Sequence, residues 1–178
     1  MRMFVSRTMI AAAMLAVLGA ASMAPLAAPK TTPRFLDNGN GTVTDNQTGL
    51  MWEKKTESNV NDTYTWSATG TAPDGTLFTS FLATMRCTIS ASGRCGFGGH
   101  YDWRVPNVSE LQTIQDCSQP NCHDPIFGPT AVAFYWSATT SVGVLTDAWG
   151  WAFADYNACP CVDDKAQADN VRAVRGGL

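Results

Sequence analysis

Six cysteines placed behind an amino-terminal segment typical of an export signal constrain this chain more than any other feature. They are Cys87, Cys95, Cys117, Cys122, Cys159 and Cys161. Residues 1–28 contain Arg2 and Arg7, then an apolar run, then small residues, which is the pattern of a cleaved signal peptide. Because exported proteins meet an oxidising compartment, an even number of cysteines predicts structural disulfides.

The cysteine spacing favours local pairs. Cys87 is expected to bond to Cys95, and Cys117 to Cys122. The Cys159-Pro160-Cys161 segment is then left over, either as a tight ring of its own or with partners elsewhere. A metal or redox site is the competing interpretation, but the only histidines are His100 and His123, and the sequence has no Cys-x-x-Cys motif. We therefore expect neither a metal nor another cofactor.

Chain length and hydropathy predict one exported domain. Removal of the signal leaves residues 29–178, about 150 residues, the size at which a single core is favoured. No later segment approaches the roughly 20 apolar residues of a membrane helix. The expected location is periplasmic or extracellular, without a membrane span.

The charge balance argues against nucleic-acid binding. The full sequence has 12 basic and 15 acidic residues, and Arg2 and Arg7 would leave with the signal. The exported chain is thus more acidic than the formal net charge of −3. Proteins hold polyanions mainly through Lys and Arg, so DNA and RNA are poor candidate partners.

The first part of the domain reads as a small β-meander. Asn-Gly-rich segments at 38–41 and 46–49 provide tight turns between strands at 35–37, 42–44 and 50–52. The acidic, glycine-rich run resembles a calcium loop only superficially, because Gly39 and Gly41 stand where an EF-hand needs oxygen-bearing side chains.

Two helices are expected in the middle of the chain. Residues 74–87 carry one apolar stripe, made of Leu77, Phe78, Phe81, Leu82 and Met85. Asn107 with Glu110 three residues later predicts a capping box at the start of a second helix, which ends before Cys117.

In the last third of the chain, successive residues alternate in the two-residue period that is typical of β-strands. We expect strands at 134–138, 148–154 and 171–174, with Trp149, Trp151 and Phe153 on one face of the second. Strands, then two helices, then strands predict an α+β fold, in which the helices pack against an antiparallel sheet.

Four motifs in order resemble one bacterial family. FLDNGNGTVTDNQTGLMW at 35–52, YDWRVPN at 101–107, YWS at 135–137 and VRAVRGG at 171–177 resemble the carboxy-terminal domain of the Legionella collagen-like adhesin, also called DUF1566. The resemblance covers nearly all of residues 29–178. It implies a C-type lectin-like fold, with two helices against a twisted antiparallel sheet and long loops, and a binding scaffold related to adhesins of host glycosaminoglycans. This chain lacks the collagen-like stalk and is acidic, so that specificity does not transfer.

The shared motifs are interpreted as structural. Trp103 is expected to anchor the core with Trp52, Trp149 and Trp151, and Arg104 to act as a buried donor. Arg172 and Arg175 are expected to pair with Asp102 or Glu110. Gln119-Pro120-Asn121 looks like a calcium motif of lectins, but its place between two cysteines favours a disulfide-closed turn.

The predicted function is a secreted, non-catalytic binding module for a cell-surface glycan or protein. Loops 137–147 and 154–170 are the expected site, because loops on a rigid scaffold carry binding groups. The candidate ligand-binding residues are Asp147, Asp155, Tyr156, Asn157, Asp163 and Asp164. A single weak site would need a homo-oligomer or many copies for firm adhesion. The alternatives are an enzyme of the formylglycine-generating fold, with Cys159 and Cys161 reactive, and a structural subunit of a surface assembly.

Overall fold

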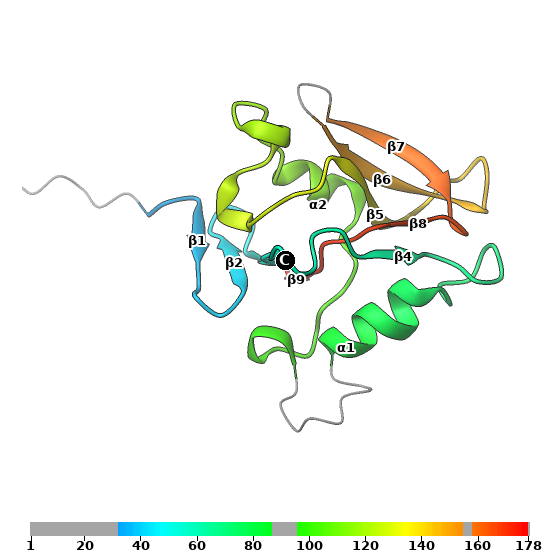
Figure 1. Ribbon diagram of the computed structural model, residues 1–178, viewed down its shortest axis with the longest axis horizontal. Helices are drawn as coiled ribbons and strands as arrows, with labels where there is room; N and C mark the ends of the chain where they lie inside the picture. The colour runs from blue at the N-terminus through cyan, green and yellow to red at the C-terminus, as the bar shows by residue number, and fades with distance from the viewer. Residues whose placement is uncertain (1–31, 87–95, 155–157, 178) are drawn as a thin grey trace, which may run out of the picture. The chain divides into compact units, whose positions relative to one another are not determined.

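The computed structural model describes residues 32–86, 96–154 and 158–177, which belong to one compact unit of the chain (Figure 1). The α+β class is confirmed. The strands in these residues are β1 (Phe35–Asp37), β2 (Thr42–Asp45), β3 (Leu50–Glu53), β4 (Thr63–Thr65), β5 (Ala133–Thr140), β6 (Asp147–Phe153), β7 (Cys159–Asp164), β8 (Ala168–Asn170) and β9 (Val174–Gly176). The helical elements are η1 (Leu77–Leu82), α1 (Ala83–Met85), η2 (Phe97–Gly99), α2 (Val108–Thr113), η3 (Pro120–Cys122) and η4 (Pro125–Phe127).

The strands form two sheets. The first has the order β1-β2-β3-β9 and is antiparallel throughout. The second has the order β4-β8-β5-β6-β7, and only its β5–β8 pairing is parallel. The expected meander is confirmed as β1, β2 and β3. Gly39, Gly41 and Gly49 have φ angles of 72°, 86° and 72°, the left-handed region that its two turns require.

The first expected helix is present but begins later than predicted. η1 is π-helical and runs directly into α1, so one helix spans 77–85 and is called here the η1/α1 helix. Its apolar stripe is buried as expected, with Leu77 fully buried and Phe81 8% exposed. Asp74 does not enter the helix. Its carboxylate accepts hydrogen bonds from the Ala68 N–H and the Thr69 hydroxyl, so it fixes the preceding loop instead.

The second expected helix is confirmed as α2, including its capping box. The Glu110 N–H donates to Asn107 Oδ1 at 2.8 Å, and the Asn107 N–H donates to Glu110 Oε2 at 2.8 Å. Leu111 and Ile114 are buried. The sequence therefore locates this helix start from two side chains alone.

The two helices cover opposite faces of the five-stranded sheet. Consecutive residues of a strand point to opposite faces, and β5 follows that rule. Trp136 packs in a core cluster with Leu77 and Phe81 of the η1/α1 helix. Tyr135 packs in a second cluster with Leu111 of α2. Figure 1 shows α2 and α1 on opposite sides of the central strands.

The expected strand at 171–174 does not exist as one element. Residue 170 ends β8 in the five-stranded sheet, and Val174 begins β9 in the four-stranded sheet. Val171, Arg172 and Ala173 connect the two sheets and are fully buried. The segment Val171-Arg172-Ala173-Val174 resembles a strand in sequence because a buried crossover can have the same composition as a buried strand.

β6 agrees with its predicted alternation only in part. Trp151 and Phe153 are buried in the cluster that faces α2. Trp149 is half-buried, so its predicted place in the core is wrong. Ala148, on the opposite face, is fully buried beside Trp136. Both faces of this sheet are covered, so alternation does not separate an inner from an outer face.

Among the described residues, helices long and apolar enough to cross a membrane are absent.

Candidate functional site

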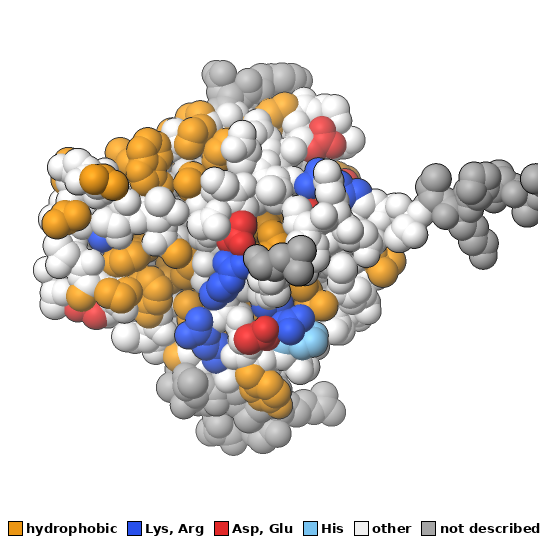
Figure 2. Space-filling view, turned by 180° about the vertical axis from the view of Figure 1, so that it is seen from behind, with side chains coloured by type: hydrophobic (Ala, Val, Ile, Leu, Met, Phe, Trp, Pro, Cys, Tyr) orange, Lys and Arg blue, Asp and Glu red, His pale blue; other side chains and the backbone are white. Residues whose placement is uncertain are grey.

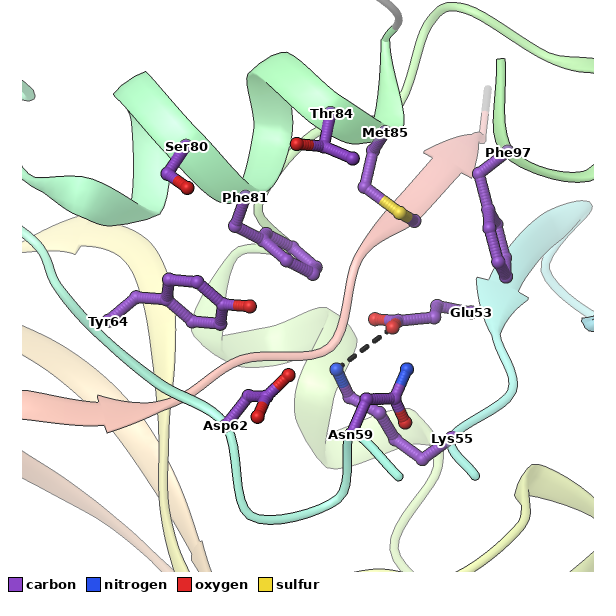
Figure 3. A pocket seen from close by; sticks show the side chains of 10 residues that line it. All are labelled: Glu53, Lys55, Asn59, Asp62, Tyr64, Ser80, Phe81, Thr84, Met85 and Phe97. Atoms are coloured by element: carbon purple, nitrogen blue, oxygen red, sulfur yellow. Dashed lines mark hydrogen bonds and ion pairs between the residues drawn. The ribbon is translucent and has the colours of Figure 1, made fainter. Parts of the chain in front are cut away.

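A cavity of about 210 Å³ lies between the η1/α1 helix and the segment that links β3 to β4 (Figure 3). Its wall combines aromatic and apolar side chains with polar groups, and the whole set is called here the cleft. The lining residues are Glu53, Lys55, Asn59, Asp62, Tyr64, Ser80, Phe81, Thr84, Met85 and Phe97. This volume is below the range typical of drug-sized ligands, so the cleft suits a small group such as one sugar ring or one side chain.

A buried ion pair forms the base of the cleft. Lys55 Nζ lies 2.9 Å from Glu53 Oε1, and the two residues are 3% and 1% exposed. Glu53 is the last residue of β3, and its second oxygen accepts the Ala173 N–H at 3.0 Å. The backbone N–H of Lys55 donates to the Phe127 carbonyl at 3.0 Å. Backbone contacts thus hold both charged side chains in place.

Lys55 retains donor capacity toward the cavity. An ammonium group has three N–H donors, and in the described part of the chain Glu53 is the hydrogen-bond acceptor found for this one. The ammonium also lies 5.1 Å from the centre of the Phe81 ring. Burial lowers the pKa of Lys55, and the Glu53 carboxylate opposes that shift. Burying such a pair costs desolvation energy, so its presence is weak evidence for stability and directs attention to a binding role.

Aromatic rings form the opposite wall. The Tyr64 and Phe81 rings are 5.0 Å apart between centroids and tilted by 44°. Figure 3 shows both rings and the Met85 side chain beside the Glu53–Lys55 pair, with Phe97 at one end. Burial raises the pKa of Tyr64, and the Asp62 and Glu53 carboxylates add to that rise. The Tyr64 phenol therefore stays protonated and can donate a hydrogen bond to a ligand.

The chemistry of the cleft is that of recognition. Ring faces offer apolar contact area, while hydroxyl, amide, ammonium and carboxylate groups at the rim and base offer directional hydrogen bonds. Two carboxylates, Glu53 and Asp62, face one ammonium, Lys55. This balance disfavours a sulfated or otherwise anionic ligand.

The structure brings some of the predicted ligand-binding residues together. Asp147 and Asp164 are direct partners in the β6–β7 register, and Asp163 is opposite Ala148. Their carboxylates serve local turns: Asp164 Oδ1 accepts the Ala166 N–H at 2.9 Å, and Asp163 Oδ1 accepts the Asp164 N–H at 2.7 Å. Groups of three or more metal-ligating side chains are not found in the described ranges.

The other predicted ligand-binding residues, Asp155, Tyr156 and Asn157, lie outside the described residues. Residues 154 and 158, which flank them, are at the end of the β6–β7 hairpin away from Asp147 and Asp164. The six-residue pairing between these ends corresponds to about 20 Å of strand. Asp147, Asp163 and Asp164 therefore lie at or next to the other end of the hairpin from residues 154 and 158, and they do not line the cleft.

The cysteines divide into three groups. The Cys117–Cys122 disulfide is present as expected, and it closes the turn that contains Gln119-Pro120-Asn121. Cys87 and Cys95 lie outside the described residues. Cys159 and Cys161 are free thiols in this structure, which differs from the expected disulfide, although their sulfur atoms are only 2.9 Å apart.

The arginines of the shared motifs have three different roles. Arg175 pairs with Asp102 as predicted, and its Nε and Nη2 atoms lie 2.7 and 3.1 Å from the two carboxylate oxygens. Arg104 forms an ion pair with Glu110. Arg172 was expected to bind one of those carboxylates and does not. It is fully buried, and its Nη1 donates to the backbone carbonyls of Glu53 and Phe127, both at 2.8 Å. Trp103 is fully buried, as expected of a core anchor.

Sequence reasoning missed the cleft because its residues come from distant segments. In the sequence, the stretch 53–75 is polar and rich in Thr, Asn, Asp and Gly, with Tyr64 and Trp66 as its aromatic residues, so it is typical of a loop. The sequence signal that could have indicated the cleft was Lys55, a charged residue that closely follows Leu50 and Trp52, which are both buried. Its enclosure depends on contacts with Phe127 and Phe81, which are both distant from Lys55 in the chain.

Together these features define a small α+β domain with a disulfide-closed turn and a partly polar cleft suited to binding. Residues 41–175 match the Lcl C-terminal domain family, and the chain belongs to that family. The match includes β2, the first two residues of β9, the η1/α1 helix and α2, and every residue that lines the cleft. Comparison with curated proteins finds no match.

Proposed function

We propose that this chain is an exported, non-catalytic binding module whose cleft holds one uncharged, hydroxyl-rich group, such as a terminal sugar of a surface glycan. Membership of the Lcl C-terminal domain family indicates a surface or adhesin-related module. The observation that carries the proposal is the buried Lys55–Glu53 pair under the Tyr64 and Phe81 rings. A C-type lectin-like fold, inferred from the resemblance, is part of this proposal.

The ligand class follows from size, apolar surface and charge. Sugar rings present C–H faces that pack on aromatic rings, and hydroxyls that both donate and accept hydrogen bonds. Lys55 can donate to a hydroxyl oxygen, while Asp62 can accept a hydroxyl proton. Each such bond adds only about 0.5–1.5 kcal/mol net, so one site binds weakly. Firm adhesion would then depend on several copies of the domain acting together.

The charge distribution supports a neutral ligand. Figure 2 shows basic side chains lying next to acidic ones on the face drawn there, and not as a separate basic patch. The ion pairs Arg104–Glu110, Arg175–Asp102 and Lys54–Asp37 show that several basic groups are already neutralised. A sulfated polymer would have to displace these partners.

A blocked cleft tests this proposal. Thr84 is exposed on the η1/α1 helix and lines the cleft, so Thr84→Trp should fill its mouth without disturbing the core. Thr79→Trp is the matched control, because Thr79 is exposed on the same helix and does not line the cleft. Both variants and the parent would be screened on a glycan array with and without calcium. The proposal fails if Thr84→Trp binds every glycan that the parent binds.

The loop between β5 and β6 favours a protein ligand as the second candidate. Val142, Val144 and Leu145 are 94%, 50% and 63% exposed there. Hydrophobic side chains also gather on part of the face in Figure 2. Exposed apolar residues on a loop are more typical of protein contacts than of sugar contacts. This loop lies within the range 137–147 that the sequence had suggested.

A further inference from the structure

Two free thiols lie side by side on an exposed strand. Cys159 and Cys161 belong to β7, an edge strand of the five-stranded sheet, and their sulfur atoms are 2.9 Å apart. Cys159 is exposed and Cys161 is half-buried. The proposed binding cleft does not include them.

The strand holds the two sulfur atoms together. Side chains two residues apart on a strand point to the same face. Pairing with β6 places Cys159 opposite Ala152 and Cys161 opposite Gly150, two small residues. Pro160 between them has no N–H, which an edge strand tolerates because only one of its sides is paired. The strand thus places both thiols on one face of β7, where their sulfur atoms reach each other.

The two thiols are not equivalent. Cys159 is the more accessible, so a reagent in solution reaches it first. Hydrogen bonding to the Cys159 sulfur raises the pKa of the Cys161 thiol to about 11, and burial adds to that rise. Cys161 therefore keeps its proton until a reaction at Cys159 removes that hydrogen bond. An exposed attacking thiol with a second thiol beside it is the arrangement that thiol–disulfide exchange requires.

We propose that Cys159 and Cys161 form a dithiol–disulfide couple that exchanges with small-molecule disulfides of the glutathione type. Loss of a proton makes Cys159 a thiolate, which attacks one sulfur of the external disulfide. A mixed disulfide forms at Cys159, and one thiolate leaves. Cys161 then loses its proton and attacks the Cys159 sulfur, which forms the internal disulfide and releases the second thiolate. The chain loses two electrons and two protons, and one external disulfide becomes two thiols.

Equilibration with glutathione tests the couple in the exported chain. Protein would be incubated in mixtures of reduced and oxidised glutathione, quenched by alkylation and analysed by peptide mass. The peptide with Cys159 and Cys161 should shift between two alkylated thiols and an internal disulfide as the mixture becomes more oxidising. Peptide mapping separates this change from reactions of the other four cysteines.

Single substitutions test the order of attack. Cys161→Ser should accumulate glutathione on Cys159, because the resolving thiol is missing. Cys159→Ser should react at least about tenfold more slowly, since its remaining thiol is less accessible. Circular dichroism would confirm that both variants fold. The proposal is overturned if the wild-type peptide keeps one state in every mixture, if it retains bound glutathione, or if Cys159 bonds to another cysteine or another chain.

Discussion

Arg104 and Glu110 form a two-point ion pair, with Nη1 to Oε2 and Nη2 to Oε1 both at 2.7 Å. The same Glu110 oxygen, Oε2, accepts the Asn107 N–H at the start of α2. Arg104 Nη2 also donates to the Gly176 carbonyl at the end of β9. One carboxylate therefore joins a helix start to the strand that closes the first sheet.

Loss of this carboxylate should destabilise the fold measurably. Glu110→Ala removes one half of the capping box and the ion pair, so we expect the free energy of unfolding to fall by about 1–2 kcal/mol. Glu110→Gln should cost less, because the amide oxygen can still accept the Asn107 N–H. Urea unfolding measures both changes. Glu57→Ala is the control on an exposed turn and should change stability by less than about 0.5 kcal/mol.

The ion pair also predicts acid sensitivity. Burial alone would raise the pKa of Glu110, but hydrogen bonds from Arg104 and Asn107 bring it below 4.5, the ordinary value. A lowered folded-state pKa contributes stability above pH 4.5 that is lost as pH falls below it. Glu110→Gln should therefore lose less stability than wild type in this acid range. Equal losses in the two proteins would contradict the prediction.

These local features were the part of the fold that the sequence made predictable. Asn107 and Glu110 are three residues apart, and the glycines of the first two turns lie between strands that are neighbours in the chain. Such signals need only short-range geometry. The pairing of Arg175 with Asp102 was also predictable, because both are charged residues within the shared motifs.

The candidate cleft required knowledge that the sequence does not contain. Glu53 is held by Ala173, which is 120 residues away in the chain, and Lys55 is held by Phe127. The change of sheet at Val171, Arg172 and Ala173 brings the Ala173 N–H to the Glu53 carboxylate, and Arg172 Nη1 donates to the carbonyls of Glu53 and Phe127. Composition cannot distinguish such a crossover from an ordinary buried strand, so both the crossover and the cleft escaped prediction.

The burial of His123 predicts a second effect of pH on folding stability, at milder acidity than the effect of Glu110. It is 3% exposed, lies 4.9 Å from both the Phe127 and Phe153 rings, and its Nε2 has no hydrogen-bond partner among the described residues. Burial, with the charge of Arg172, lowers the pKa of His123 from 6.5 to about 2. The folded protein therefore holds this histidine neutral, while the unfolded chain takes up a proton below pH 6.5.

Stability should consequently fall as pH drops below 6.5, by up to about 1.4 kcal/mol per pH unit from this group. His123→Phe should remove this dependence, since a third phenyl ring cannot be protonated. Urea midpoints measured from pH 7 downward would show the difference. A slope that survives in His123→Phe would disprove the assignment.

Export makes a prediction about the amino terminus. If residues 1–28 are a cleaved signal, protein recovered from the periplasm or medium should begin between residues 22 and 30. Amino-terminal sequencing of that protein is the measurement. Recovery of the chain with Met1 intact would contradict export by this route.

The predicted binding loops can be compared directly with the cleft. Residues 154–170 contain β7 and β8 and are not the single loop that the sequence suggested. Tyr156→Ala with Asn157→Ala should abolish binding if this segment is the site, and leave binding intact if the cleft is the site. Thr84→Trp should give the reverse result. A third variant, Val142→Ser, tests the apolar β5–β6 loop and should affect only a protein ligand. Unfolding midpoints would confirm that no variant loses binding through loss of structure.

Arg172 should be the least replaceable of the motif arginines, because its charge is fully buried and its fork joins three segments. Nη1 donates to the Glu53 and Phe127 carbonyls at 2.8 Å, and Nη2 donates to Thr130 Oγ1 at 3.1 Å. A lysine has a single ammonium group and cannot reproduce the planar fork. We expect Arg172→Lys to lower the free energy of unfolding by about 2–4 kcal/mol.

Arg175→Lys is the matched control for this change. Arg175 pairs with Asp102, whose side chain is 59% exposed, so water can replace the lost contacts. Its replacement should cost no more than about 1 kcal/mol. Urea unfolding of the two variants under identical conditions gives the comparison. Because Arg172 holds the Glu53 backbone, Arg172→Lys should also weaken any ligand binding in the cleft, whereas Arg175→Lys should not. Equal effects of the two substitutions would show that the buried fork has no special role.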